Sequence, residues 1–121
     1  MIKLTFALVR RPEFTRRSFQ EYWFNNHAPL VASVREVLRI RRYVQLHSLP
    51  VEDSAVLRQS RGGPEDFDGV AQLWWESLED LAAASASASA ADAAQRLLED
   101  ERKFIDLARS PLWLGEEKVI F

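Results

Sequence analysis

The apolar positions in the first residues follow the pattern of a β-strand. The even-numbered positions of segment 2–9 are apolar, whereas its odd-numbered positions are mixed. A period of two predicts a strand there, and similar patterns predict further strands over 40–49, 67–75 and 116–121. Before the last of these strands, a turn is predicted between Pro111 and Gly115.

The next segment changes to a helical period. Apolar residues recur at steps of three and four, which predicts a helix over 16–37 with one apolar face. Thr15 is the predicted N-cap, because its hydroxyl can accept from the free amides of the first turn. Pro29 has no amide hydrogen, so a kink or a freed carbonyl is expected near Asn25.

The second half of the chain is less regular. Residues 50–66 are rich in Pro, Gly and charge, and they predict a long loop. Ser77 is the predicted start of a short helix over 78–84. The Ala- and Ser-rich segment 82–94 predicts a loose helix with a break, and Asp92 is the predicted start of the last helix.

The resulting order is β-α-β-β-α-β, the ferredoxin-like plan. It predicts an α+β fold in which helices cover one face of a four-stranded antiparallel sheet. The other face carries Trp74 or Trp75 and has no third layer to cover it. Because a large exposed apolar patch is unusual on a monomer, we expect two sheets to pair face to face in a homodimer.

Composition narrows the choice of function. The 121 residues suit one domain, 1–121, and are 47% hydrophobic and 28% charged. The absence of cysteine excludes a disulfide framework, a Cys-based zinc site and a Cys nucleophile. A net charge of −2 argues against binding to nucleic acid or to an anionic membrane. The first residues do not resemble a signal peptide, so a cytoplasmic location is expected.

Three segments resemble the EthD family of dimeric α+β barrels. They are Phe19–Val31 with its F-x-x-Y-W and H-A-P-L motifs, Phe67–Trp75 followed by Ser77-Leu78-Glu79, and Glu99–Asp106. The resemblance implies a ferredoxin-like fold whose dimer closes, sheet to sheet, into an α+β barrel. It also implies small-molecule chemistry, because the family and its superfamily include ether-degradation accessory proteins, aromatic polyketide dehydratases, lactone isomerases and cofactor-free monooxygenases.

His27 is the candidate catalytic residue. It lies four residues after Trp23, beside the apolar face of the first helix and next to the predicted kink. A neutral imidazole in an apolar pocket can accept or donate a proton near neutral pH, so His27 is a candidate general acid or base. The alternative is a structural histidine packed under the sheet.

Other side chains are candidates for binding a substrate, because they are aromatic or polar and belong to the same helix or to the central strands. These residues are Tyr22, Trp23, Asn26, Tyr43, His47, Gln72 and Trp74. We expect neither a metal nor a cofactor, since the chain has no H-x-x-x-H or E-x-x-H pairing. A heme-linked member of the superfamily would have only His27 and His47 as axial candidates.

Three hypotheses for function follow. The first is a cofactor-independent enzyme that dehydrates, isomerises or decarboxylates an oxygenated, largely apolar or aromatic compound, or a monooxygenase of the same superfamily. The second is an accessory protein that binds such a compound without turnover. The third, an RNA-recognition module, is disfavoured because 67–75 carries Asp68 and no Lys or Arg.

Overall fold

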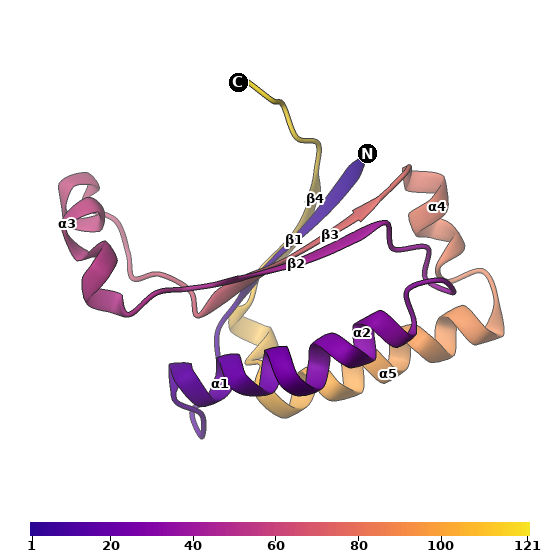
Figure 1. Ribbon diagram of the computed structural model, residues 1–121, viewed down its shortest axis with the longest axis horizontal. Coiled ribbons are helices and arrows are strands. Elements are labelled where there is room, and N and C mark those ends of the chain that lie inside the picture. The colour runs from indigo at the N-terminus through magenta and orange to yellow at the C-terminus, as the bar shows by residue number, and fades with distance from the viewer.

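The computed structural model describes all 121 residues. Its centre is a four-stranded antiparallel sheet with the strand order β2-β3-β1-β4. The strands are β1 (Ile2–Leu8), β2 (Arg42–His47), β3 (Gly69–Trp75) and β4 (Leu112–Gly115). The main helices are α1 (Arg16–Tyr22), α2 (Ala28–Ser33) and α5 (Ala88–Phe104). All three lie on one face of the sheet (Figure 1), so the predicted ferredoxin-like plan is confirmed.

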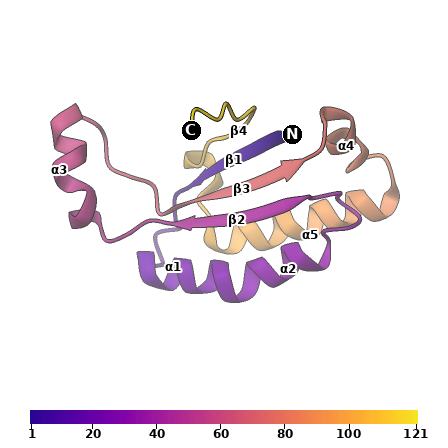
Figure 2. The same ribbon diagram turned by 45° about the horizontal axis from the view of Figure 1, so that its top comes forward.

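Strand pairing sets which side chains face the helices. Leu4 lies opposite Leu73, and Phe6 lies opposite Ala71, in the pairing of β1 with β3. Opposed residues of neighbouring strands point to the same face of the sheet. These four residues therefore share one face, and they pack there in a hydrophobic cluster with residues of the helices. Figure 2 shows the order of the strands and the helices beneath them.

The first helix is interrupted at the place the sequence predicted. Thr15 caps α1 and exchanges hydrogen bonds with Ser18, as a capping box does. One turn of π-helix, η1 (Trp23–His27), then joins α1 to α2, and the Ala28 amide donates to the Trp23 carbonyl. The expected kink therefore takes the form of a wider turn. The helix ends earlier than predicted, at Ser33, and residues 34–39 form turns.

The prediction of a loop over 50–66 was wrong, because Val51–Arg61 forms a helix, α3. Its signals are local: Glu52 and Asp53 lie in the first turn, and Gly62 ends the helix with a left-handed φ of 62°. No residue of α3 is buried, so the segment has no apolar periodicity to detect. Figure 1 shows α3 standing off one end of the sheet.

The Ala- and Ser-rich segment contains the predicted break between two helices. Ser77 caps α4 (Leu78–Ala83), as expected. The predicted start of α5 at Asp92 was wrong, because the Ser87 side chain accepts from the Ala90 amide and caps the helix there. Ala90 and Ala93 are buried against the sheet, so these alanines are core residues.

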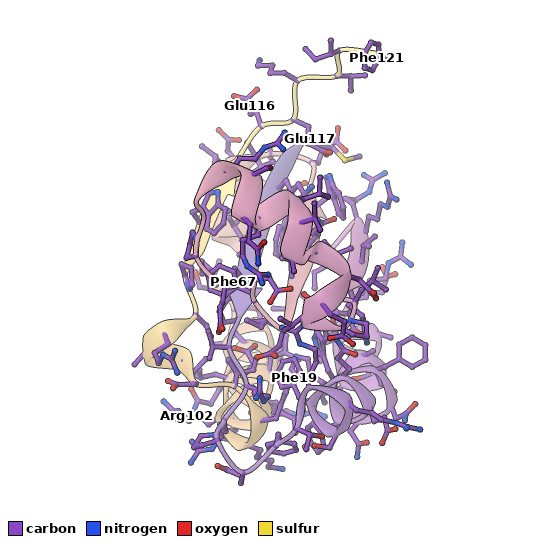
Figure 3. All side chains as sticks on the ribbon, turned by 90° about the vertical axis from the view of Figure 1, so that its left-hand side faces the viewer. Phe19, Phe67, Arg102, Glu116, Glu117 and Phe121 are labelled. Atoms are coloured by element: carbon purple, nitrogen blue, oxygen red, sulfur yellow. The ribbon has the colours of Figure 1, made fainter.

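The predicted last strand, 116–121, was wrong as well. Instead β4 forms at Leu112–Gly115, where Leu112 and Leu114 lie opposite Phe6 and Leu4 of β1. The predicted turn between Pro111 and Gly115 is therefore a strand that is paired with the centre of the sheet. Residues 116–121 are exposed and extend beyond the body, as Figure 3 shows for Glu116, Glu117 and Phe121.

The two central tryptophans of β3 point to opposite faces. Trp75 faces the helices, packs in one of the two hydrophobic clusters and donates to the Leu38 carbonyl over 2.8 Å. Trp74 faces away from the helices, beneath Lys3 and Arg42, and its indole donates to Glu117 over 2.5 Å. None of the helices has the length and apolar character that crossing a bilayer requires.

Candidate functional site

The π-turn η1 places Trp23 and His27 beneath the centre of the sheet. Both side chains are buried, with 1% and 5% of their surface exposed. The Trp23 indole lies against Gly69 of β3, where a Cβ atom would come within 2.5 Å of the ring. Glycine is therefore required at this position for the indole to approach the strand. π-turns within helices often occur at functional sites, because they re-aim the side chains around them.

A carboxylate from α5 holds His27 in one orientation. The Nδ1 atom of His27 lies 2.7 Å from Oδ2 of Asp100, and the Tyr22 hydroxyl donates to Oδ1 of the same carboxylate over 2.6 Å. A carboxylate only accepts, so Nδ1 carries the proton and Nε2 is left as the basic atom. Asp100, Tyr22 and His27 therefore form a hydrogen-bonded triad with one unused basic nitrogen.

The triad borders a small cavity between the helices and the sheet. The cavity measures about 50 Å³, and nine of its eleven lining residues are hydrophobic. His27, Glu101 and Tyr43 are the titratable groups in its wall. A space of this size accepts a few water-sized groups, so it can take the reacting end of a substrate.

Burial changes the acidity of these groups. It lowers the pKa of His27 below 6.5, and the hydrogen bond to Asp100 offsets part of the effect. Burial would raise the pKa of Asp100, yet the hydrogen bonds from Tyr22 and His27 outweigh it and lower that pKa below 3.8. At neutral pH the site therefore pairs a neutral imidazole with an ionised Asp100.

Glu101 behaves differently from its neighbour. Burial, together with the charge of Asp100, raises the pKa of Glu101 to about 7. A carboxyl group in an apolar wall can therefore keep its proton near neutral pH. The site thus combines a base, His27, with a group that can act as an acid.

A second hydrogen-bond chain lies on β2. The Gln45 amide nitrogen donates to the Trp23 carbonyl over 3.1 Å and to the Tyr43 hydroxyl over 2.7 Å. Its oxygen lies 2.7 Å from Nε2 of His47, which must then carry the proton. Because the Tyr43 oxygen accepts from Gln45, the Tyr43 proton remains available to another acceptor.

A larger depression of about 440 Å³ lies outside this site. It is lined by six residues, Arg17, Gln20, Glu21, Phe24, Asn25 and His47, and is open to solvent. His47 stacks on Trp23 there, with 4.6 Å between ring centroids. We place the candidate site at the smaller cavity, because the hydrogen-bonded titratable groups are there.

The side chains of the site do not favour a bound metal ion or a heme. No group of three or more His, Asp or Glu side chains is arranged to hold a metal ion. A heme does not fit a cavity of about 50 Å³.

Comparison with known proteins gives the family. A family model described as the EthD domain matches residues 11–108, which is most of the chain. The chain belongs to the EthD family. The resemblance to the EthD family that the sequence suggested is therefore confirmed.

The chain is similar to a curated EthD relative and to solved structures of the same family. The "conidial pigment biosynthesis dehydratase EthD" of Metarhizium robertsii is 27% identical over 120 residues, covering 95% of this chain and 81% of that protein. An EthD-family protein of Bacillus halodurans is 24% identical, with a TM-score of 0.61 and coverage of 98% and 100% of the two chains.

Two further structures share the fold at lower identity. A Bacteroides fragilis protein, described as dimeric and ferredoxin-like, is 8% identical, with a TM-score of 0.58 and coverage of 96% and 95%. SnoaB of Streptomyces nogalater, described as a cofactor-independent oxygenase, is 15% identical, with a TM-score of 0.54 and coverage of 98% and 93%. At these identities the likeness shows the fold alone.

The EthD domain brings together several of the residues that the sequence suggested. His27, Trp23 and Tyr43 border the cavity, and Tyr22 binds the carboxylate behind His27. His47 lies on the far side of the Trp23 ring.

Three other candidates lie elsewhere. Gln72 and Trp74 point to the sheet face opposite the helices, because they alternate with Ala71 and Leu73, which line the cavity. Asn26 is exposed on η1 and does not line the cavity.

Sequence reasoning missed Asp100, Glu101 and Gln45 as members of the site. Glu101 carried a usable signal, because it follows Leu97 by four residues and precedes Phe104 by three, on the buried side of α5. A carboxyl group at such a position needs an explanation. Asp100 had no comparable signal, since its partner His27 is 73 residues away in the sequence.

Proposed function

We propose that this EthD domain is a cofactor-independent enzyme in which His27 removes a proton from a small, largely apolar, oxygenated substrate. The observation that carries the proposal is the buried hydrogen bond of 2.7 Å between His27 Nδ1 and Asp100. It keeps Nε2 basic, and it stabilises the imidazolium that forms when Nε2 takes a proton.

The surroundings of His27 support this role over a structural one. A packed structural histidine needs a hydrogen bond but no cavity, whereas His27 borders a cavity with apolar walls. The pKa of His27, lowered by burial, keeps the imidazole unprotonated near neutral pH. Tyr22 fixes the other oxygen of Asp100, so the carboxylate cannot rotate away from the ring.

Dehydratase-type chemistry is the reaction class that we favour. Elimination of water requires a base at a carbon and an acid at a leaving hydroxyl, and no redox cofactor. The Metarhizium relative is described as a dehydratase, which agrees with this class. Isomerisation and decarboxylation would use the same base, with a different fate for the carbanion.

Exchange of an acidic C–H proton in D₂O tests the base directly. A simple ketone, 4-phenylbutan-2-one, would be incubated with the protein and its deuterium uptake followed by NMR. We expect His27→Gln to lower the enzyme-dependent exchange by about 10²- to 10⁴-fold. Asn25→Gln, an exposed change on the same turn, is the matched control. Equal exchange by the wild type and His27→Gln would remove His27 from this role.

A binding protein without turnover is the alternative, and it would use the same cavity. It predicts that 4-phenylbutan-2-one shifts the NMR signals of the residues around the cavity while no deuterium enters the ketone. The same experiment therefore separates the two functions.

We further propose that two copies pair through the sheet faces that point away from the helices. Leu46 and Trp113 lie on that face, and 55% and 51% of their surfaces are exposed. The Bacteroides structure is described as dimeric, which supports the proposal. Native mass spectrometry should give the mass of two chains, and Leu46→Glu should shift it to one. Val56→Glu on α3 is the control, and a wild-type mass of one chain would contradict the proposal.

A further inference from the structure

We propose that Glu101 is the catalytic proton donor to a leaving hydroxyl, and that the substrate class is therefore a β-hydroxy ketone. The inference rests on the proposed function, because it assigns the second proton transfer of the same elimination. Its evidence is the arrangement of Glu101, His27 and Tyr43 around one cavity.

Glu101 is placed as an acid that acts inside the cavity. It lies on α5 directly after Asp100 and lines the cavity from the helix side, among apolar residues such as Leu97 and Ile105. Unlike Asp100, it makes no hydrogen bond or ion pair with another side chain. Because a carboxyl group in an apolar wall usually needs a partner, a polar group of a substrate is the natural one.

Burial and the groups around Glu101 let it retain a proton near neutral pH. Burial disfavours the charged carboxylate, and Asp100 adds a negative charge from the same helix, so the pKa of Glu101 is raised to about 7. Tyr43 faces it from β2, and burial raises the pKa of that hydroxyl to about 12, so it stays neutral. His27 faces the cavity from η1 as a neutral imidazole at this pH. None of these neighbours is a cation that would lower the pKa of Glu101.

Tyr43 supplies the third polar function. Gln45 is oriented by the Trp23 carbonyl, which can only accept, so its amide nitrogen is the atom that donates to Tyr43. The Tyr43 oxygen is thus an acceptor in that bond, and its own hydrogen can point to a ligand. A donor on a carbonyl oxygen stabilises the enolate that forms when an adjacent C–H is deprotonated.

The elimination balances with these three residues alone. His27 Nε2 takes the proton from the carbon next to the carbonyl, and the C–H electron pair forms the new C=C bond. The C–O bond of the β-hydroxyl breaks, its electron pair stays on oxygen, and the Glu101 proton converts that oxygen to water. His27 is then an imidazolium and Glu101 a carboxylate. His27 releases one proton to solvent and Glu101 takes one up, which restores both groups.

This set of roles defines the substrate class. Tyr43 requires a carbonyl oxygen, His27 an acidic C–H beside it, and Glu101 a hydroxyl one carbon further on. A β-hydroxy ketone presents these three features in that order. The remaining cavity walls are hydrophobic, so the rest of the reacting end is apolar.

The test uses three probe ketones with the whole protein. The first is 4-hydroxy-4-phenylbutan-2-one, whose dehydration gives a conjugated enone that absorbs in the near ultraviolet. The second is its acetate ester, whose leaving group needs no proton. The third, 4-phenylbutan-2-one, has no leaving group and reports only deuterium exchange through His27. Glu101→Gln keeps the size of the side chain, and Glu99→Gln on the exposed side of α5 is the control.

We expect Glu101→Gln to lower dehydration of the hydroxy ketone by about 10²- to 10⁴-fold. The same variant should retain deuterium exchange and elimination of the acetate. If Glu101 had only a structural role, its substitution would lower all three activities together. If Glu101→Gln does not fold, Glu101→Asp should dehydrate the hydroxy ketone slowly and keep exchange.

Each failure has a distinct signature. Equal rates of dehydration by Glu101→Gln and the wild type would overturn the role of Glu101. Deuterium exchange by the wild type without any dehydration would overturn it as well. Either result leaves His27 as the base. Absence of exchange and dehydration in the wild type would overturn the proposed function and this inference together.

Discussion

Substituting Asn for Asp100 would test whether the carboxylate charge, and not only its shape, holds the site together. Asp100 accepts two short hydrogen bonds, over 2.6 Å from Tyr22 and over 2.7 Å from His27, and 9% of its surface is exposed. Asn preserves the shape and can accept one of these bonds. It has no negative charge, and its amide hydrogens face either Tyr22 or His27.

The expected loss can be worked out from the two bonds. A hydrogen bond to a charged group stabilises a protein by about 1.5–3 kcal/mol, compared with about 1 kcal/mol for a neutral pair. Losing the charge therefore costs about 1 kcal/mol per bond, or about 2 kcal/mol in the free energy of unfolding at neutral pH. The ion pair with Lys103, at 3.6 Å, adds little because the lysine is exposed.

The pH dependence provides a sharper test. The pKa of Asp100 lies below 3.8 in the folded chain, so the unfolded state takes up a proton first as the pH falls. The stabilisation is therefore complete above about pH 4 and disappears as the pH falls through the lower, folded pKa.

Urea unfolding at a series of pH values would measure both effects. We expect Asp100→Asn to be less stable than the wild type at pH 7 and to approach it below pH 3.8. Asp92→Asn, on the exposed side of α5, is the matched control and should change stability little. The reasoning would be refuted if the free energies of unfolding of the wild type and Asp100→Asn differed by the same amount at pH 7 and below pH 3.8.

Three further changes test other parts of the structure. Gly69→Ala places a Cβ atom 2.5 Å from the Trp23 ring, so we expect a loss of about 1–3 kcal/mol in urea unfolding and a changed near-ultraviolet circular dichroism spectrum. Gly63→Ala, whose nearest contact would be 3.8 Å, should leave both unchanged, and equal effects would contradict the packing argument. Ser87→Ala removes the cap of α5 and should cost about 1 kcal/mol in thermal unfolding; no change would mean that the helix begins elsewhere. Glu101→Gln should gain stability over the wild type between pH 4.5 and about 7, because in this range the unfolded wild type loses the Glu101 proton while the folded protein keeps it, which lowers the free energy of unfolding; a flat difference would contradict the burial of Glu101.

The sequence predicted those parts of the fold that repeat along the chain. The alternation in β1 and β3 predicted both strands to within two residues and placed Leu4 and Phe6 on one face of β1. Thr15 and Ser77 identified two helix starts, because a cap is a local interaction between neighbours.

The prediction missed elements that have no periodic pattern of apolar residues. α3 has no buried face, so only its terminal charges and Gly62 marked it. The start of α5 was hidden because Ala90 and Ala93 serve as core residues there, although alanine does not show which side of a helix is buried.

The site was only partly visible for a different reason. His27 belonged to a distinctive segment, whereas Asp100 became a partner only when α5 packed beside η1. Periodicity placed Gln72 and Trp74 together on one face of β3 but could not say that the cavity lies under the other.

The isolation of α3 has a consequence for how the molecule opens. Arg16 holds the two ends of the segment that carries α3, because it donates to the Leu49 carbonyl and to Asp66. None of the eleven residues of α3 is buried. A helix of that length has marginal stability by itself in water. Its amides should therefore exchange with deuterium far sooner than those of β1 and β3, and a protease should cut there first. The same independence makes 51–61 the stretch where insertions and deletions would be best tolerated, because no packing in the rest of the domain depends on its length.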